Sequence, residues 1–250
     1  MVLQTELENQ GNWLFRRRSL LPLLVLALGL ATQVVTFREY AVSRPALLSH
    51  WHLYEWGCLA VGIAGLWVRA YTVGFTPEGT SGRNTACQVA DSLNTTGIYS
   101  VVRHPLYVGN FLMWLSVALL TCNDGFVAAF VLAYWLYYER IMYAEEQFLT
   151  RKFGEAYTSW AQHTPAIVPC FKHFKRSALP YSWKKVLKKE KNGVFALLLL
   201  FSVFDAITAQ LSGQTEVNMP LLALTVASGI AYLVLKYLKR RTSLLDEQGR

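Results

Sequence analysis

Apolar residues fall into six long blocks along the chain, with polar segments between them. The blocks cover positions 19–37, 53–73, 106–121, 126–138, 194–211 and 220–235. Each has roughly 13–21 residues, close to the ~20 residues that a helix needs to cross the hydrocarbon core of a bilayer. A soluble protein with buried helices is the alternative, but six such blocks in 250 residues argue against it. The pattern predicts an all-α integral membrane protein with about six transmembrane helices.

The connections and the basic residues predict the topology. Only four residues, 122–125, join the third and fourth blocks, so those two helices must be antiparallel neighbours. Three arginines precede the first block, ten lysines and arginines lie between positions 150 and 191, and four more follow the last block at positions 236–241. Cytoplasmic segments carry such an excess of positive charge. We therefore expect helices paired in hairpins, with both termini in the cytoplasm.

The net charge of +8 is accounted for by this topology. A basic run at positions 184–191 could contact nucleic acid, but a run beside a membrane segment more usually meets anionic lipid headgroups. The expected partner is therefore the lipid bilayer, and no nucleic acid. The four cysteines show neither CxxC spacing nor histidine partners, so neither a metal site nor a disulfide is predicted.

Residues 97–109, GIYSVVRHPLYVG, form the first candidate site. Pro105 is suited to the first turn of a helix, where its missing N–H has no partner to lose. The free amides and the dipole at a helix N-terminus favour an anion, and Arg103 and His104 precede that turn. The stretch predicts an anion site where a polar loop enters a membrane helix, with the pocket facing the cytoplasm.

The second candidate site lies at the end of the fourth block. The tight hairpin brings Glu145 and Glu146 to the same end as Arg103 and His104. Tyr143 and Glu146 share a helix face, since they are three residues apart. The alternative is an ordinary helix end with solvated charges. An opposing cationic pair across the hairpin favours a functional site.

Four further expectations concern the flanking segments. Residues 1–18 are expected to form a loose tail or to lie on the membrane, and residues 171–191 a surface helix on the bilayer. Arg69 is expected to extend to water at the cytoplasmic helix end rather than to face the site. Asp205 is expected to lie close enough to the outer face to stay hydrated. The polar loop 74–102 is long, as lids and binding loops often are.

Residues 97–169 resemble the isoprenylcysteine carboxyl methyltransferase and phospholipid methyltransferase superfamily of integral membrane enzymes. The matching pieces are GIY at 97–99, RHPLYVG at 103–109, EEQFL at 145–149, FGEAY at 153–157 and VP at 168–169. Trp160 departs from the pattern, because a second aromatic residue after Tyr157 is usually tyrosine. The chain also continues for eighty residues past Pro169, whereas many relatives stop soon after that point.

The resemblance implies S-adenosylmethionine as the methyl donor. It assigns catalytic roles to Arg103, Glu145 and Glu146. The residues expected to bind the donor are His104, Pro105, Tyr107, Gly109, Tyr143 and Tyr157. As a hypothesis, Arg103, His104 and the amides at Pro105 receive the donor carboxylate, while tyrosine faces attract the sulfonium. One of the two glutamates takes the ribose hydroxyls or the amino group, and the other pairs with a nearby arginine.

The acceptor is expected to be a membrane lipid or a lipidated molecule. A lipid phosphate or headgroup and an isoprenylcysteine-type carboxylate both remain open. Two other readings also remain: a membrane reductase that uses NADPH, and a non-catalytic membrane protein. We divide the chain into an N-terminal hairpin with a polar loop (1–96), a methyltransferase core (97–169) and a basic segment with a C-terminal hairpin (170–250). The sequence predicts no oligomeric state.

Overall fold

The computed structural model of the chain describes residues 2–43, 48–77, 88–213 and 216–249, and the regular elements within them are helices. They are α1 (Leu3–Arg16), α2 (Leu20–Ser43), α4 (Trp51–Phe75), α5 (Pro105–Leu119), α6 (Asp124–Phe153), α7 (Glu155–His163), α8 (Trp183–Ser212) and α9 (Met219–Arg241), with short 3-10 turns η1 (Ile98–Ser100) and η2 (Phe171–His173). Each predicted apolar block lies almost entirely in one of the six helices α2, α4, α5, α6, α8 and α9, and only positions 19, 120 and 121 fall outside them.

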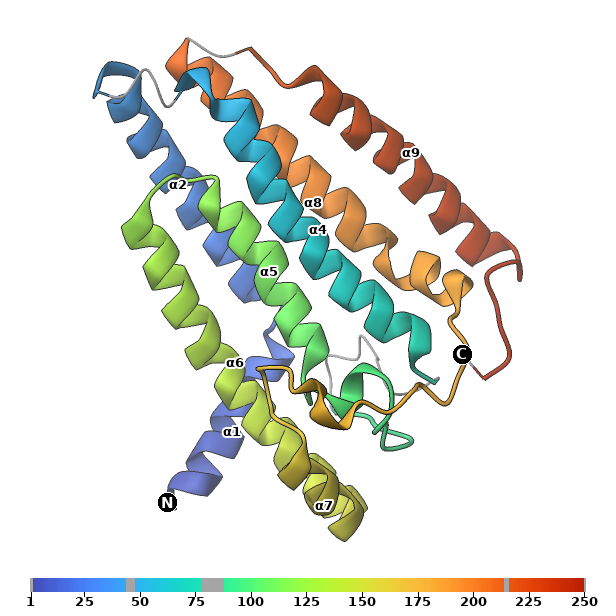
Figure 1. Cartoon of the computed structure of the whole chain (residues 1–250). Helices are drawn as coiled ribbons and strands as arrows, with labels where there is room; N and C mark the ends of the chain where they lie inside the picture. The colour runs from blue at the N-terminus through green and yellow to red at the C-terminus, as the bar shows by residue number, and fades with distance from the viewer. Residues whose placement is uncertain (1, 44–47, 78–87, 214–215, 250) are drawn as a thin grey trace.

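The six long helices run up and down side by side (Figure 1). In the described part of the chain α2, α4, α8 and α9 are long and apolar enough to cross a membrane, while α5 is apolar but has only 15 residues. The second half of α6 is charged. An all-helical membrane architecture is therefore confirmed. Six crossings and the cytoplasmic position of both termini stay predictions.

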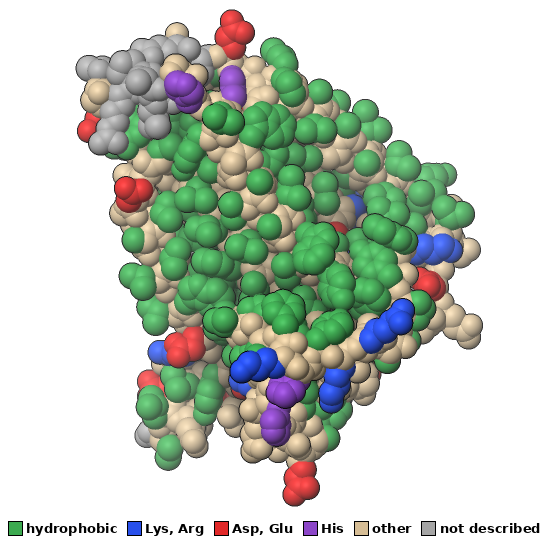
Figure 2. Space-filling view, viewed as in Figure 1, with side chains coloured by type: hydrophobic (Ala, Val, Ile, Leu, Met, Phe, Trp, Pro, Cys, Tyr) green, Lys and Arg blue, Asp and Glu red, His purple; other side chains and the backbone are tan. Residues whose placement is uncertain are grey.

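The surface agrees with a membrane-embedded body. On the face shown in Figure 2, hydrophobic side chains cover most of the middle of the molecule, and charged side chains gather mainly toward its two ends. Large apolar residues are exposed on several helices, such as Leu28, Trp67, Leu132 and Leu233. Exposure of that kind is costly in water and favourable in lipid.

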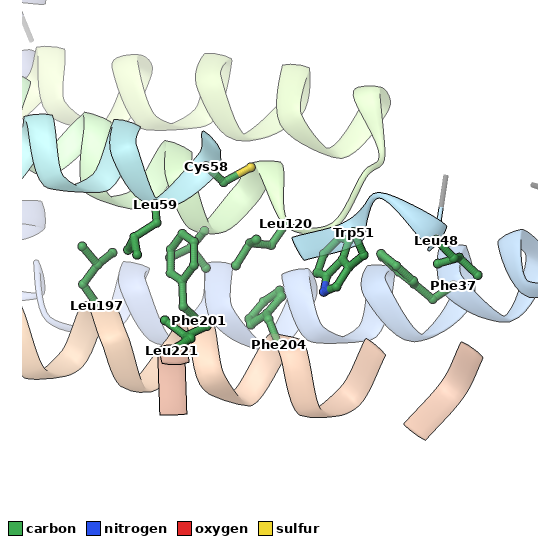
Figure 3. Packing of buried hydrophobic residues seen from close by; sticks show 11 residues of the cluster. Phe37, Leu48, Trp51, Cys58, Leu59, Leu120, Leu197, Phe201, Phe204 and Leu221 are labelled. Carbon is green, nitrogen blue, oxygen red and sulfur yellow. The ribbon is translucent and has the colours of Figure 1, made fainter. Parts of the chain in front are cut away.

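The core lies between α2, α4, α5 and α8. Phe37, Trp51, Phe201 and Phe204 are almost completely buried there and belong to one cluster with Leu120 (Figure 3). Phe37 meets the Trp51 ring edge-on, with 5.0 Å between ring centroids. Such aromatic pairs contribute beyond their buried area. This cluster holds the first and last thirds of the chain together.

Glycines allow α4 and α5 to approach closely. A Cβ atom on Gly65 would lie 2.6 Å from the Gly109 carbonyl oxygen, and a Cβ on Gly109 would lie 2.9 Å from the Gly65 oxygen. Small residues at a membrane helix crossing permit this backbone contact. The contact fixes the start of α5, and with it Arg103 and His104, relative to α4.

The N-terminal segment is not a loose tail. It forms α1, which packs on α6: a Cβ on Gly11 would lie 2.1 Å from the Arg140 carbonyl oxygen. Tyr137 donates a hydrogen bond to the Leu14 carbonyl, and Glu8 pairs with Arg151. The expectation of a loose tail was therefore wrong, because a glycine at the contact lets this helix dock on α6, whereas its position on the membrane stays a prediction.

The expected surface helix at 171–191 is also wrong. Residues 174–182 are irregular, and α8 begins at Trp183 and continues without a break into the apolar block. Ser182 caps the helix by accepting a hydrogen bond from the Lys185 amide. The Lys185 ammonium is buried and donates to the carbonyls of Thr76 and Pro77 at the end of α4. A helix C-terminus thus replaces the lipid headgroup as the partner of this cation.

Asp205 is likewise not hydrated, since only 1% of it is exposed. Its partners are inside the bundle and include the Trp51 indole and the Asn218 amide. Asn218 is the N-cap of α9, so this acid lies where α9 begins.

We expect Gly65→Ala to destabilise the protein. The added methyl would meet the Gly109 carbonyl, and such overpacking costs about 1–3 kcal/mol. Gly57→Ala is the matched control on the same helix, because a Cβ there meets nothing within 4 Å. Thermal unfolding of the detergent-purified variants measures both effects. A Gly65→Ala protein as stable as Gly57→Ala would contradict the proposed close crossing.

Candidate active site

A cavity of about 340 Å³ opens at one end of the bundle. Its walls come from the start of α5, the ends of α1, α4 and α6, the start of α8, and the loop that precedes η1. The lining residues include Arg18, Arg69, Gln88, Leu93, Tyr99, Arg103, His104, Pro105, Tyr107, Asn110, Tyr138, Glu145, Phe148, Tyr157, Trp160, Lys189 and Glu190. Its size suits a small organic ligand.

Backbone hydrogen bonds hold the stretch before α5 against the segment that follows α7. Gly97 adopts a left-handed φ of 62°, and its amide donates to the Lys175 carbonyl at 2.9 Å. The Arg103 amide donates to Pro165, and the His104 amide to Ala166. Pro105 then opens α5, as the sequence predicts. The Arg103 and His104 side chains therefore project from a segment that is held by hydrogen bonds.

Arg103, His104 and Glu146 form the cluster that joins α5 to α6. Arg103 Nε and His104 Nε2 both lie 2.9 Å from Glu146 Oε1. Arg103 Nη1 also donates to the carbonyls of Ala161 and Thr164, at 2.8 and 2.7 Å. These bonds use Nε and Nη1 of the guanidinium. The third nitrogen, Nη2, takes part in none of them and can bond another partner.

Glu146 lies on the polar extension of α6. Burial alone would raise its pKa, but the hydrogen bond and positive charge of His104, together with Arg103, lower the pKa of Glu146 below its ordinary value. The ionised carboxylate is therefore the form that the folded structure stabilises. Glu146 orients the two cationic side chains and lies behind the cavity wall.

Glu145, unlike its neighbour Glu146, lines the cavity. Its Oε2 accepts a hydrogen bond from the Tyr107 hydroxyl at 2.9 Å, and His104 Nδ1 lies 3.8 Å from the same oxygen. The rings of His104 and Tyr107 stack at a centroid distance of 5.6 Å. About a third of the Glu145 side chain stays exposed. The wall can therefore offer a negative charge to a ligand.

Tyr157 supplies an unpaired hydroxyl to the same wall. The residue is only 3% exposed, and within the described residues its hydroxyl has no hydrogen-bond partner. Burial raises the pKa of Tyr157 above its usual range, and the nearby Glu146 carboxylate adds to the effect. A buried polar group without a partner costs free energy. A ligand that hydrogen-bonds this hydroxyl would remove that cost.

Arg69 of α4 also lines the cavity. It does not extend to water at the helix end: Nε and Nη2 each donate to Glu190 of α8 at 2.8 Å, and Nη1 donates to Asn110 of α5. The expectation of an extended side chain is therefore wrong. Two polar partners inside the bundle, one of them 121 positions away, make the inward orientation favourable.

The structure brings six of the nine predicted site residues to the cavity wall: Arg103, His104, Pro105, Tyr107, Glu145 and Tyr157. Glu146 lies one layer behind them. Gly109 packs against α4, where a Cβ would lie 2.6 Å from Arg69 Cγ. Tyr143 is half-buried on α6 and is not among the lining residues. The roles assigned to all nine residues stay predictions.

Several lining residues were not found from the sequence. Asn110 is a polar residue in an apolar helix, three positions after Tyr107, and that isolation was a usable signal. Glu190 is the single acid in a basic run, and that was a weaker signal. The loop residues 88–90 and 92–94 border the cavity, as expected of a binding loop, whereas positions 80–84 of the same loop lie outside the described residues.

Comparisons with known proteins indicate the family of the chain. Residues 54–156 match the family model described as phospholipid methyltransferase. The chain is 32% identical over 151 residues to protein-S-isoprenylcysteine O-methyltransferase B of Arabidopsis thaliana. The matched region covers 57% of this chain and 73% of that protein. Its A counterpart is 26% identical over 156 residues, covering 60% and 72%.

A third relative is named for metal resistance and not for methyl transfer. The cobalt-zinc-cadmium resistance protein CzcN of Cupriavidus metallidurans is 38% identical over 79 residues, which is 32% of this chain and 36% of that protein. No solved structure matches the chain.

We expect Glu146→Gln to lower stability at neutral pH by about 1.5–3 kcal/mol, because hydrogen bonds to a charged group are lost. The folded-state pKa of Glu146 lies below the unfolded value of about 4.3. The stabilisation is therefore present above that pH and is lost as the pH falls through the folded-state pKa.

Thermal unfolding between about pH 7 and pH 3 measures this effect. Wild type should lose stability across the acidic range more steeply than Glu146→Gln. Glu139→Gln is the control, because Glu139 is 64% exposed on the same helix. Parallel pH profiles for wild type and Glu146→Gln would show that Glu146 is not held ionised by the cluster.

Proposed function

Because the chain belongs to the superfamily of integral membrane methyltransferases that includes the isoprenylcysteine carboxyl methyltransferases, we propose that it transfers a methyl group from S-adenosylmethionine to the carboxylate of an isoprenylcysteine-type acceptor. The reaction takes place in the cavity between α4, α5, α6 and α8, which we propose faces the cytoplasm. The observation that carries this proposal is the wall on which Arg103, His104, Tyr107, Glu145 and Tyr157 converge.

The residues of this wall fit the donor. When bound, S-adenosylmethionine supplies an activated methyl group on a sulfonium cation. Arg103 Nη2, which the bonds to Glu146 and to the two carbonyls do not use, is placed to bind the donor carboxylate. The Tyr157 hydroxyl can bond a ribose or amino group. The Tyr107 ring and the Glu145 carboxylate provide a face for positive charge.

The helix N-terminus contributes less to anion binding than the sequence indicates. The Arg103 and His104 amides donate to Pro165 and Ala166, and the Tyr107 and Val108 amides donate to the His104 carbonyl. Pro105 has no amide hydrogen. In the first turn, the Leu106 amide is the one that takes part in none of these bonds. Side chains, above all Arg103, therefore provide most of the anion recognition in this proposal.

A carboxylate acceptor needs no base at neutral pH, because it is already ionised. Its oxygen forms the new bond to the methyl carbon as the carbon–sulfur bond breaks, and the electron pair of that bond stays on sulfur. The protein's task is to align the two reactants and to exclude water. The fixed segment before α5 and the loop 88–94 serve these two purposes in this chain.

A membrane lipid phosphate is the second candidate acceptor, since it presents the same anionic oxygen and the family model is that of phospholipid methyltransferases. The carboxylate is preferred because both Arabidopsis relatives are named protein-S-isoprenylcysteine O-methyltransferases. Arg69, which lines the cavity and is paired with Glu190, is the residue that we propose approaches the acceptor.

Calorimetric titration of the purified protein should show saturable binding of S-adenosylmethionine and none of NADPH. His104→Ala should weaken that binding at least tenfold, because the ring stacks on Tyr107 and orients Glu146. His163→Ala is the control, since His163 is exposed on α7. Binding of NADPH alone would replace the proposal with a membrane reductase.

Incubation with S-adenosylmethionine carrying a tritiated methyl group should label N-acetyl-S-farnesylcysteine and leave its carboxamide unlabelled. The product should release labelled methanol in mild alkali, because an ester is hydrolysed there and an N-methyl group is not. A phospholipid extract is the parallel substrate. Label in the lipid alone would assign the lipid acceptor, and no label in either would refute both candidates.

A further inference from the structure

A second group of ionisable residues lies at the far end of the bundle from the cavity. Glu55 and Asp205 are each only 1% exposed, and His52 stands beside them in the first turn of α4. Arg69, at the cavity, is seventeen residues further along the same helix, a rise of roughly 25 Å. Figure 1 shows the start of α4 beside the end of α8 at the end where α8 connects to α9.

The partners of the two carboxylates are neutral donors. Trp51 Nε1 donates to Asp205 Oδ1 at 3.2 Å, and the Asn218 amide donates to Asp205 Oδ2 at 2.7 Å. Asn218 Nδ2 donates to Glu55 Oε2 at 2.8 Å. Among the described residues, neither acid forms an ion pair with a lysine or an arginine. Two buried carboxylates so close together require positive charge or a proton between them.

Two buried atoms of this group have no hydrogen-bond partner within the described part of the chain: Glu55 Oε1 and His52 Nδ1. His52 Nδ1 lies 3.7 Å from Glu55 Oε2 and 3.8 Å from Asp205 Oδ1. These distances are too long for hydrogen bonds. Atoms that share one tetrahedral ion at about 2.0–2.2 Å lie roughly 3.4 Å apart, so the observed spacing suits a central ion.

We propose that His52, Glu55 and Asp205 bind a divalent transition-metal ion of the zinc class. One ligand atom from each residue lies within 4.8 Å of the others. An imidazole with two carboxylates is a ligand set for such ions, whereas calcium and magnesium prefer oxygen ligands alone. The His52 side chain is 41% exposed, which gives the ion a path from the aqueous phase.

The site would connect three parts of the bundle. His52 and Glu55 belong to α4, Asp205 belongs to α8, and Asn218, which bonds both acids, caps α9. An ion bound there would hold the C-terminal hairpin to α4. Binding to the folded chain alone also raises its stability by mass action.

The test uses the full chain, purified in detergent, stripped with a chelator and dialysed against Zn²⁺. Wild type should retain about one equivalent of zinc beyond the buffer blank, and its thermal midpoint should rise with added zinc. His52→Ala should weaken zinc binding at least tenfold and lose the midpoint shift. His52 is half-exposed, so its removal leaves the buried packing in place.

Glu39→Gln is the matched control, because Glu39 is an exposed acid at the end of α2 and should leave zinc binding unchanged. Glu55→Gln tests the buried ligand, with circular dichroism and gel filtration as checks on folding. Zinc retained equally by wild type and His52→Ala would refute the site. So would a folded wild type that retains no zinc, since the two carboxylates would then share a proton instead.

Discussion

A single carboxylate oxygen, Oε1 of Glu146, carries much of the arrangement around the cavity. It accepts hydrogen bonds from Arg103 and His104, and Arg103 in turn binds two carbonyls at the end of α7. Three segments are thereby held in one orientation at the point where a polar loop becomes a membrane helix. With Arg103 and His104 fixed in this way, Tyr107 and Glu145 form the wall that faces a ligand.

The sequence predicts the helices and the main cluster because both follow from local patterns. Six apolar blocks give six long helices, and the four-residue turn at 122–125 forces Arg103 and Glu146 to the same end. The wall formed by Arg69 and Glu190 could not be predicted in this way. Its two residues lie 121 positions apart, and nothing local indicates which helices will be neighbours.

The same limit explains the errors about buried charge. Lys185 and Asp205 are expected at a water or lipid surface, because a charge alone in an apolar region is costly. In the structure Lys185 meets carbonyls at the end of α4, and Asp205 meets an indole and an amide. Partners of this kind are backbone groups or distant side chains, so a one-dimensional pattern does not reveal them.

The charges at the cavity also fit the proposed chemistry. Glu190 is paired with Arg69, and Glu146 with Arg103, so Glu145 is the acid that can interact most directly with a cationic ligand. Transfer of a methyl group from a sulfonium to a carboxylate turns two charged reactants into two neutral products. Charge is thus lost in the transition state, and a site with few net charges and little water favours that loss, since opposite charges attract more strongly at low dielectric. Glu146 and Glu190 are each balanced by an arginine, so they add little to the field that separates the reactants' charges, and Glu145 is left to orient the sulfonium toward a carboxylate acceptor.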